Sequence, residues 1–449
     1  MPPKSFNLNI NNKILSYKKV IEADSDKSIS IRSFLIGSIS HDISSVKNVL
    51  ESDDVFSTIK SLKNLGVKIT KQKPKSYLIY GKGLGSLFSK KKMQLNFGNS
   101  GTLARLLIGI LSTTPNIEVK VKGDHSLNKR NMRELIKLMG LFGANFKPVN
   151  KYRFPLKIIS SNIPIGINYK AGVSAQLKSA VILAGLNSYG NTKILETKKS
   201  RDHTENMLLN NVKLIKITNN KFKKTIVVKG KNNLKPININ VPGDPSSAAF
   251  YTALTLLNKN SSINIKNVGL NSTRIGFYNL LKECGAKIKF TKLKKENNEL
   301  RGNILVESCK IKSLKASKDY YVNSTDEYPI LFVIASLLNG TSVFKGIGEL
   351  ANKESNRIVE MQKILKQIGI KSIFTNNDLK IFGKGMVDAS NKKIIVPNLG
   401  DHRICMSAFI LAVLTGAKTK IKNFETVFTS SPSFLKIMKF LGAKYEIQK

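Results

Sequence analysis

The sequence predicts an α/β protein, α+β in strict class terms, with two domains that each contain three similar units. Three observations support this prediction. The chain has 449 residues, whereas single hydrophobic cores stop growing at roughly 250 to 300 residues. Hydrophobic residues make up 41% of it, which excludes a disordered or fibrous chain. A short helix–glycine–strand phrase recurs from end to end, and its spacing leaves room for several strands and two helices in each repeat.

The repeated phrase consists of an apolar helix end, a glycine or asparagine, and a basic strand. Glycine at this place accepts the left-handed backbone that ends a helix, and the residues after it alternate as strand residues do. The phrase centres, at intervals of 68 to 84 residues, on Gly66, Gly143, Asn211, Gly285, Gly369 and Gly442. The copy at Asn211 is the weakest. Six copies at such regular spacing indicate a duplicated unit.

The middle of the chain interrupts this pattern at residues 241–245, which read Val-Pro-Gly-Asp-Pro. Asp244 suits a helix N-cap and Pro245 suits the first helical position, so we expect a helix from Ser246 to Leu257. We therefore assign Asp244 a capping role rather than a catalytic one. The boundary between the two halves is expected here.

Unusual polar residues stand at the expected starts of helices. These starts expose backbone N–H groups and partial positive charge, so they bind phosphates and carboxylates. Ordinary capping explains any single motif. Several cations also stand beside these caps, although capping does not require them. Arginine in particular suits anion binding, because its planar fork matches carboxylate and phosphate. The cations are Lys27, Arg32, Arg130, Arg357 and Arg403.

Two carboxylates are candidates for acid–base chemistry. Lys353, Glu354 and Arg357 are spaced to share one side of the first turn of a helix. A surface salt bridge would explain this spacing. The alternative is proton transfer beside an anion clamp, with Asp326 as a second carboxylate.

The chain is strongly basic, with 74 Lys and Arg against 29 Asp and Glu, a formal charge of +45. Such a charge can indicate a nucleic-acid partner. The lysines, however, are spread from Lys4 to Lys449, basic clusters such as Lys90–Lys92 are short, and tryptophan is absent. We therefore favour a solvated basic surface, compatible with small anionic substrates, over nucleic-acid binding.

Several other signals are weak or missing. The longest apolar candidate, Tyr328–Leu338, has the length of a core helix rather than a membrane span. The N-terminus lacks the apolar run of a signal peptide, so a cytoplasmic protein is expected. Neither a disulfide framework nor a metal site is predicted from the scattered cysteines and histidines. The segment Gly81–Gly85 matches a nucleotide-binding fingerprint only loosely.

Eight polar motifs occur in order and cover nearly the whole chain. They are Asp26–Arg32, Gly98–Thr102, Gly123–Arg130, Arg201–Glu205, Gly243–Ala248, Asp326–Pro329, Lys353–Arg357 and Asp401–Arg403. Together they resemble the motifs of the 3-phosphoshikimate 1-carboxyvinyltransferase, or EPSP synthase, family. Ala175, where many members have serine, and Thr429, where one branch has a lysine that binds phosphoenolpyruvate, point to its second sequence class.

The resemblance implies two domains, each of three βαβαββ units around a pseudo-threefold axis, with the active site in the cleft between them. One domain would combine residues 1–22 with 242–449, and the other would hold 23–241. The implied reaction moves the enolpyruvyl group of phosphoenolpyruvate to the 5-hydroxyl of shikimate 3-phosphate and releases phosphate through a tetrahedral intermediate. Domain closure would expel water. These two small molecules are the expected partners of a monomer, with no cofactor, metal, nucleic acid or membrane.

The resemblance also assigns residues to the two substrates. Contacts with shikimate 3-phosphate are implied for Lys27, Ser28, Arg32, Ser174, Ala175, Gln176, Arg201, Asp326 and Lys353. Contacts with phosphoenolpyruvate are implied for Lys27, Asn99, Gly101, Arg130, Gln176, Arg357 and Arg403. Asp326 is the candidate base for the attacking hydroxyl, and Glu354 or Lys27 would protonate the methylene carbon.

Two further positions bear on the site. Asn131 replaces the proline that usually follows the arginine of the loop at Gly123–Arg130. Gly101, in place of a bulkier residue, leaves room at the phosphoenolpyruvate site, so we expect glyphosate to inhibit.

Two alternative functions were weighed against this one. A sister transferase places enolpyruvyl on UDP-N-acetylglucosamine with the same fold and chemistry. That enzyme generally carries a cysteine in a mobile loop, and none of the three cysteines here lies near Gly123–Arg130. A basic nucleic-acid-binding protein of related fold would instead show salt-sensitive affinity and no phosphate release.

Overall fold

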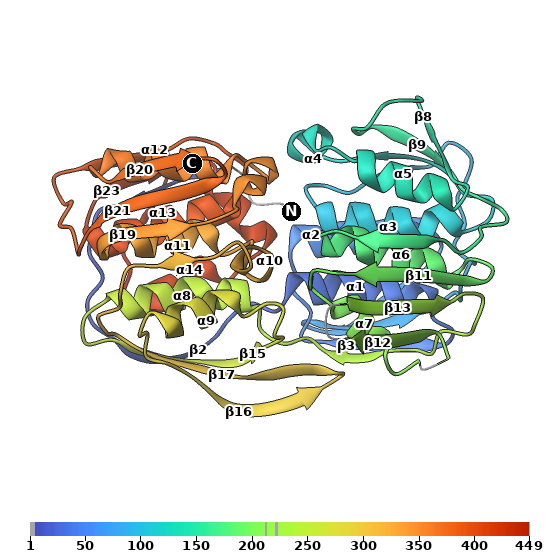
Figure 1. Ribbon diagram of the computed structural model, residues 1–449, viewed down its shortest axis with the longest axis horizontal. Helices are drawn as coiled ribbons and strands as arrows, with labels where there is room; N and C mark the ends of the chain where they lie inside the picture. The colour runs from blue at the N-terminus through green and yellow to red at the C-terminus, as the bar shows by residue number, and fades with distance from the viewer. Residues whose placement is uncertain (1–4, 212, 221–222, 449) are drawn as a thin grey trace. The chain divides into compact units, whose positions relative to one another are not determined.

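The computed structural model describes residues 5–211, 213–220 and 223–448. The chain forms two compact units (Figure 1). Unit 1 contains the chain up to Asp24, Pro242–Glu296 and the chain from Leu300 onward, and unit 2 contains Ser25–Val241 and Asn297–Glu299. The chain passes from unit 1 to unit 2 after Asp24, two residues later than the expected boundary after residue 22. The expected boundaries also did not place Asn297–Glu299 in unit 2.

Unit 2 alternates strands and helices along the chain. Its helices are α1 (Lys27–Ile39), α2 (Asp53–Asn64), α3 (Gly101–Thr113), α4 (His125–Lys129), α5 (Arg133–Leu141), α6 (Ala175–Leu186) and α7 (His203–Leu208). Its strands are β3 (Ile43–Lys47), β4 (Lys68–Lys73), β5 (Ser76–Tyr80), β6 (Gln94–Asn96), β7 (Glu118–Lys122), β8 (Asn145–Lys147), β9 (Leu156–Ile159), β10 (Asn168–Ala171), β11 (Asn191–Glu196), β12 (Ile215–Asn220), β13 (Lys223–Lys229) and β14 (Asn238–Asn240).

Unit 1 has the same alternation. Its helices are α8 (Pro245–Leu257), α9 (Gly276–Glu283), α10 (Tyr320–Ser324), α11 (Tyr328–Ser336), α12 (Arg357–Gln367), α13 (His402–Thr415) and α14 (Phe434–Phe440), with 3-10 turns η1 (Gly348–Asn352) and η2 (Phe424–Thr429). Its strands are β1 (Asn7–Ile10), β2 (Lys18–Glu22), β15 (Ser262–Gly269), β16 (Ile288–Glu296), β17 (Glu299–Glu307), β18 (Lys315–Ala316), β19 (Asn339–Phe344), β20 (Lys371–Thr375), β21 (Asp378–Lys384), β22 (Lys393–Val396), β23 (Lys418–Ile421) and β24 (Glu446–Gln448).

The described strands form six sheets of four strands each, three in each unit. The orders in unit 2 are β14-β3-β5-β4, β6-β7-β9-β8 and β10-β11-β13-β12, and those in unit 1 are β16-β17-β15-β2, β18-β19-β21-β20 and β22-β23-β1-β24. Each sheet has one parallel pair at an edge. The six equivalent sheets confirm the duplicated unit that the repeated phrase predicted.

Five of the six phrases have the backbone that their glycines predict. Gly66, Gly143, Gly285, Gly369 and Gly442 all lie at positive φ, between +79° and +101°, where a helix gives way to a strand. In the sixth phrase, which has Asn211 in place of the glycine, the side chain makes a contact that glycine could not make. Oδ1 of Asn211 accepts a hydrogen bond of 3.0 Å from the backbone N–H of Lys235.

Each unit is built around helices that are apolar on all sides. Every residue of α8 and of α13 is buried, as is expected of a helix without a polar face. With α11, these helices belong to the hydrophobic core of unit 1, while α1, α3 and α6 contribute to a separate core in unit 2 (Figure 1). No helix in the described part of the chain combines the length and hydropathy that crossing a membrane requires.

The expected start of α8 is confirmed. Pro245 is its first residue, and Asp244 caps it by accepting a hydrogen bond of 2.8 Å from the N–H of Ser246. Asp244 also receives a hydrogen bond of 3.1 Å from the buried Arg274, so its carboxylate is engaged in the structure of unit 1.

The helices α3 and α6 approach each other closely at Gly109. A Cβ atom at this position would lie 2.6 Å from the carbonyl oxygen of Ala180 and 2.9 Å from its Cα. Because backbone atoms cannot move aside as a side chain can, glycine is required at this contact.

Gly109→Ala is therefore expected to destabilise unit 2 by about 1–3 kcal/mol, the usual cost of overpacking a core. Gly140→Ala is the matched control, because Gly140 lies exposed in α5 and an added Cβ would meet no atom within 4 Å. There the gain in helix propensity predicts about 0.5–1 kcal/mol of stabilisation. Urea unfolding of both variants measures the difference, and equal midpoints would contradict the close approach.

Candidate active site

The structure places the sequence-predicted site residues in two sets, one in each unit. The unit 2 set is Lys27, Ser28, Arg32, Asn99, Gly101, Arg130, Ser174, Ala175, Gln176 and Arg201. The unit 1 set is Asp326, Lys353, Glu354, Arg357 and Arg403. Most of these residues lie at or near the N-terminal ends of helices, as expected. Arg130 is an exception, since it caps the C-terminal end of the short helix α4.

The start of α1 presents two cations. Asp26 caps the helix by accepting a hydrogen bond of 2.8 Å from the N–H of Ile29. Lys27, half-buried, has its Nζ 3.1 Å from Oδ2 of Asp54 in α2. Arg32 lies one turn further and is buried, with its Nη1 donating to the carbonyl oxygen of Ser28 at 3.1 Å. Ser28 and Arg32 thus lie on the same face of α1.

The start of α3 carries a second cluster of cations. Ser100 caps this helix through the N–H of Leu103. Gly101 has two guanidinium groups beside it, because a Cβ built there would lie 2.8 Å from Nη1 of Arg105 and 2.9 Å from Nη1 of Arg130. Two arginines at a helix start suit the binding of an anion.

Side-chain hydrogen bonds hold the two arginines of this cluster in place. Arg130 donates from Nη2 to Oδ1 of Asn99 at 2.6 Å. Arg105 donates from Nη1 to Oε1 of Gln176 at 2.9 Å, and Gln176 in turn donates from Nε2 to Oγ1 of Thr102 at 3.0 Å. The sequence reasoning missed Arg105. Arg105 follows Gly101 by four residues, as Arg32 follows Ser28. This spacing is the sequence signal that could have identified Arg105.

The start of α6 carries three further candidates. Ser174 is the N-cap and accepts a hydrogen bond of 3.4 Å from the N–H of Leu177. Ala175 and Gln176 follow as the first helical residues, and all three are half-buried. Arg201, also half-buried, stands just before α7.

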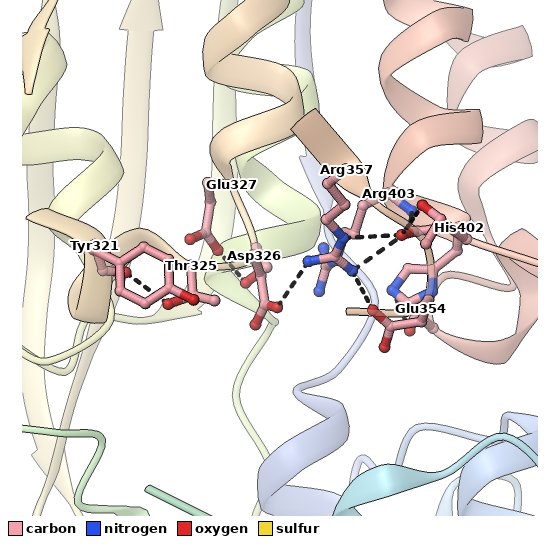
Figure 2. A network of polar contacts seen from close by, with 12 residues as sticks. Tyr321, Thr325, Asp326, Glu327, Glu354, Arg357, His402 and Arg403 are labelled. Carbon is pink, nitrogen blue, oxygen red and sulfur yellow. Dashed lines mark hydrogen bonds and ion pairs between the residues drawn. The ribbon is translucent and has the colours of Figure 1, made fainter. Parts of the chain in front are cut away.

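Arg357 is the centre of the unit 1 set (Figure 2). Its side chain is 1% exposed, and three carboxylates surround its guanidinium. Nε donates to Oδ2 of Asp401 at 2.9 Å, Nη2 donates to Oε2 of Glu354 at 2.6 Å, and Nη1 lies 3.6 Å from Oδ1 of Asp326.

This arrangement keeps Arg357 charged. Burial alone would lower the pKa of its guanidinium, but Asp401, Glu354 and Asp326 together raise that pKa above its usual value. The contact between Glu354 and Arg357 is therefore not an ordinary surface salt bridge. It joins a buried cation to a carboxylate that is still 20% exposed.

One detail of the sequence prediction was wrong. Lys353 and Glu354 do not lie in the first turn of a helix, because α12 begins only at Arg357. Asn356 caps it by accepting a hydrogen bond of 3.2 Å from the N–H of Val359. The two residues instead lie in the segment after the 3-10 turn η1, where Nζ of Lys353 sits 5.9 Å from the ring centroid of Tyr321.

Asp401 was not among the candidates, although it organises the unit 1 set. It is buried and caps α13 by accepting a hydrogen bond of 3.0 Å from the N–H of Arg403. Its other oxygen accepts hydrogen bonds from Arg357 and, at 3.0 Å, from Oγ of Ser355. One carboxylate thus holds together the starts of α12 and α13.

Arg403 differs from Arg357 in its partners. Its guanidinium is buried and lies 6.0 Å from the ring centroid of Phe250. Within the described residues, neither its Nε nor its Nη1 has a hydrogen-bond partner. Buried donors of this kind are normally satisfied, so the position suits a ligand that brings an anionic oxygen. The described residues contain no group of three His, Cys, Asp or Glu side chains that could hold a metal ion.

Comparison of the sequence with known families gives one match over most of the chain. A family model described as EPSP synthase (3-phosphoshikimate 1-carboxyvinyltransferase) matches residues 12–438. A 3-phosphoshikimate 1-carboxyvinyltransferase of Zymomonas mobilis subsp. mobilis is 35% identical over 431 residues, 95% of this chain and 94% of that relative. One of Bacillus pumilus is 37% identical over 425 residues, 94% of this chain and 96% of the relative.

Solved structures give the same result. An EPSP synthase from Acinetobacter baumannii superposes with a TM-score of 0.84 at 31% identity, covering 99% of this chain and all of that one. The enolpyruvyl transferase NikO from Streptomyces tendae superposes with a TM-score of 0.74 at 12% identity, covering 99% of each chain. The second likeness concerns the fold alone.

Proposed function

The chain belongs to the EPSP synthase family, the 3-phosphoshikimate 1-carboxyvinyltransferases, and from this premise we propose which of its residues carry the reaction. The enzyme transfers the enolpyruvyl group of phosphoenolpyruvate to the 5-hydroxyl of shikimate 3-phosphate, which gives 5-enolpyruvylshikimate 3-phosphate and phosphate in the shikimate pathway. The observation that carries the proposal is the buried Arg357 with Asp326 and Glu354 beside it, since it combines an anion-binding group with two carboxylates.

Asp326 is proposed as the base that takes the proton of the attacking hydroxyl. Its side chain is 25% exposed, so it is accessible to the substrate hydroxyl, and its Oδ1 lies 3.6 Å from Nη1 of Arg357. As the hydroxyl oxygen bonds to C2 of phosphoenolpyruvate, the methylene carbon gains a proton and a tetrahedral intermediate forms. Loss of phosphate and of one methyl proton then regenerates the double bond in the product.

Glu354 and Lys27 are the two candidates for the proton on the methylene carbon. An anionic ligand on Arg357 would compete with Glu354 for Nη2, which places Glu354 beside the ligand that Arg357 binds. Lys27 is an ammonium that the structure pairs with Asp54.

The arginines are proposed to hold the anionic groups of phosphoenolpyruvate. Arg130 from the unit 2 set, with Arg357 and Arg403 from the unit 1 set, supply fixed positive charge that needs no rearrangement as the negative charge moves. Asn99, Gly101 and Gln176 complete these contacts. Lys27, Ser28, Arg32, Ser174, Ala175, Gln176, Arg201, Asp326 and Lys353 are proposed to bind shikimate 3-phosphate. Both sets would then act on the same pair of substrates.

We further propose that the protein works as a cytoplasmic monomer on these two small molecules. One chain supplies every candidate residue, and both substrates are charged phosphates, which do not cross membranes unaided. Recognition of the phosphate groups of both substrates also accounts for part of the basic charge without a nucleic-acid partner.

Phosphate release tests this function and the role of Asp326 together. The wild-type protein is expected to release phosphate from phosphoenolpyruvate with shikimate 3-phosphate, and not with UDP-N-acetylglucosamine. Asp326→Ala should lower kcat by roughly 10²- to 10⁴-fold, the usual contribution of a general base, whereas calorimetry should show shikimate 3-phosphate binding weakened far less than kcat. Asp319→Ala, at an exposed carboxylate that makes no side-chain cap bond in α10, is the control. Full activity of Asp326→Ala would remove the proposed base.

Gly101 provides a separate test of the phosphoenolpyruvate site. Glyphosate is expected to inhibit the wild-type enzyme. Gly101→Ala adds a Cβ within 3 Å of two guanidinium nitrogens, so Arg105 or Arg130 must move. We expect the KM for phosphoenolpyruvate to rise about tenfold, equivalent to about 1.4 kcal/mol, and glyphosate inhibition to weaken. Steady-state kinetics with Gly140→Ala as the control measures both, and unchanged values for phosphoenolpyruvate and glyphosate would place Gly101 outside the site.

A further inference from the structure

Two hydroxyl groups hold the guanidinium of Arg32. Its Nε donates a hydrogen bond of 2.9 Å to Oγ1 of Thr204 in α7, and its Nη2 donates one of 3.3 Å to Oγ of Ser179 in α6. Thr204 also donates from its Oγ1 to Oγ of Ser179 at 2.8 Å. All three side chains are buried. Together with the bond to Ser28, these contacts fix the plane of the guanidinium from three helices.

A buried ionic cluster, made of Lys178, Glu196, Glu205 and Lys224, adjoins this hydroxyl pair. Nζ of Lys178 lies 2.7 Å from an oxygen of Glu196 and 2.7 Å from one of Glu205, and all three side chains are at most 1% exposed. Lys224 lies at the edge of the cluster, with its Nζ 3.6 Å from Oε1 of Glu205 and 3.9 Å from Oε2 of Glu196. Lys178 and Ser179 are neighbours in α6, and Glu205 and Thr204 are neighbours in α7.

Lys178 and Glu196 favour each other's charged form. Burial alone would lower the pKa of Lys178, but Glu205 and Glu196 raise it above its usual value. Burial alone would raise the pKa of Glu196, but Lys178 and Ser200 bring it below its usual range. A buried cluster of this kind is no better for stability than apolar side chains of the same volume, whereas it specifies one arrangement of the elements that it joins.

The elements joined by the cluster are those that carry candidate ligands of shikimate 3-phosphate. Lys178 is two residues beyond Gln176 in α6. Glu196 ends β11 and accepts hydrogen bonds from both N–H and Oγ of Ser200, at 2.9 and 2.7 Å, directly before Arg201. Glu205 lies in the first turn of α7, directly after Thr204. The positions of Gln176 and Arg201 and the orientation of Arg32 therefore depend on one buried framework.

We propose that Thr204 and Ser179 are positioning residues, which hold Arg32 in the orientation that binds an anionic group of shikimate 3-phosphate, and that the ionic cluster around Lys178 fixes the helices that present them. This inference rests on the proposed function. Neither hydroxyl touches substrate in this account; both act through Arg32.

Thr204→Val tests the proposal, because it keeps the shape of the side chain and removes both hydrogen bonds. The KM for shikimate 3-phosphate is expected to rise about tenfold, the scale of one hydrogen bond to a charged group, with kcat and the KM for phosphoenolpyruvate changed less than twofold. Thr204→Ser retains the hydroxyl and should behave as wild type. Thr113→Val is the matched control, since Thr113 is buried in α3 and its Oγ1 donates only to a carbonyl of its own helix, at 3.4 Å from Ile110.

The possible results separate the proposal from its premise. An unchanged KM for shikimate 3-phosphate in Thr204→Val, or an equal loss in Thr204→Ser or Thr113→Val, would overturn the positioning role. If Thr204→Val fails to fold in thermal unfolding, Ser179→Ala should show the same selective rise in KM, and its absence would also overturn the role. A wild-type protein that releases no phosphate would instead contradict the proposed function itself.

Discussion

The structure depends on one constraint, which is that a buried helix leaves the backbone N–H groups of its first turn without partners in the helix, so that other groups must satisfy them. The helices α8 and α13 have no exposed residue, and most residues of α1, α3 and α6 are buried as well. Their N-terminal N–H groups must be capped, and the caps gather polar side chains at those ends. The candidate cations Lys27, Arg32 and Arg403 are found at or near these same ends. There the partial positive charge of the helix N-terminus adds to the positive charge of the side chains.

Buried positive charge in the unit 1 set is stable because carboxylates of the same unit surround it. Arg357 contacts Asp401, Glu354 and Asp326, and only Asp401 is entirely buried. The inner carboxylate fixes the guanidinium, while the two outer carboxylates remain partly exposed and can exchange protons or give way to a ligand. The same Arg357 can therefore serve both as part of the fold and as part of the proposed chemistry.

Much of the fold and part of the site could be predicted from the sequence, because both have local signals. Gly369 and its equivalents mark the repeated helix ends, and Asp244 with Pro245 marks the start of α8. The misplacement of Lys353 and Glu354 arose because Asn356, and not an earlier residue, caps α12. Contacts such as Arg32 with Thr204, 172 residues apart, have no local pattern. They become visible only when the chain is folded.

The central claim is that the helix starts of both units act on the same two substrates. Hydrogen–deuterium exchange of the wild-type protein, with and without shikimate 3-phosphate and phosphoenolpyruvate at equilibrium, tests it most directly. The account predicts slower exchange at residues 27–32 and 174–179 of unit 2 and, in the same sample, at 353–357 and 401–403 of unit 1. Slower exchange confined to one unit, with the other unaffected at saturating substrates, would contradict it.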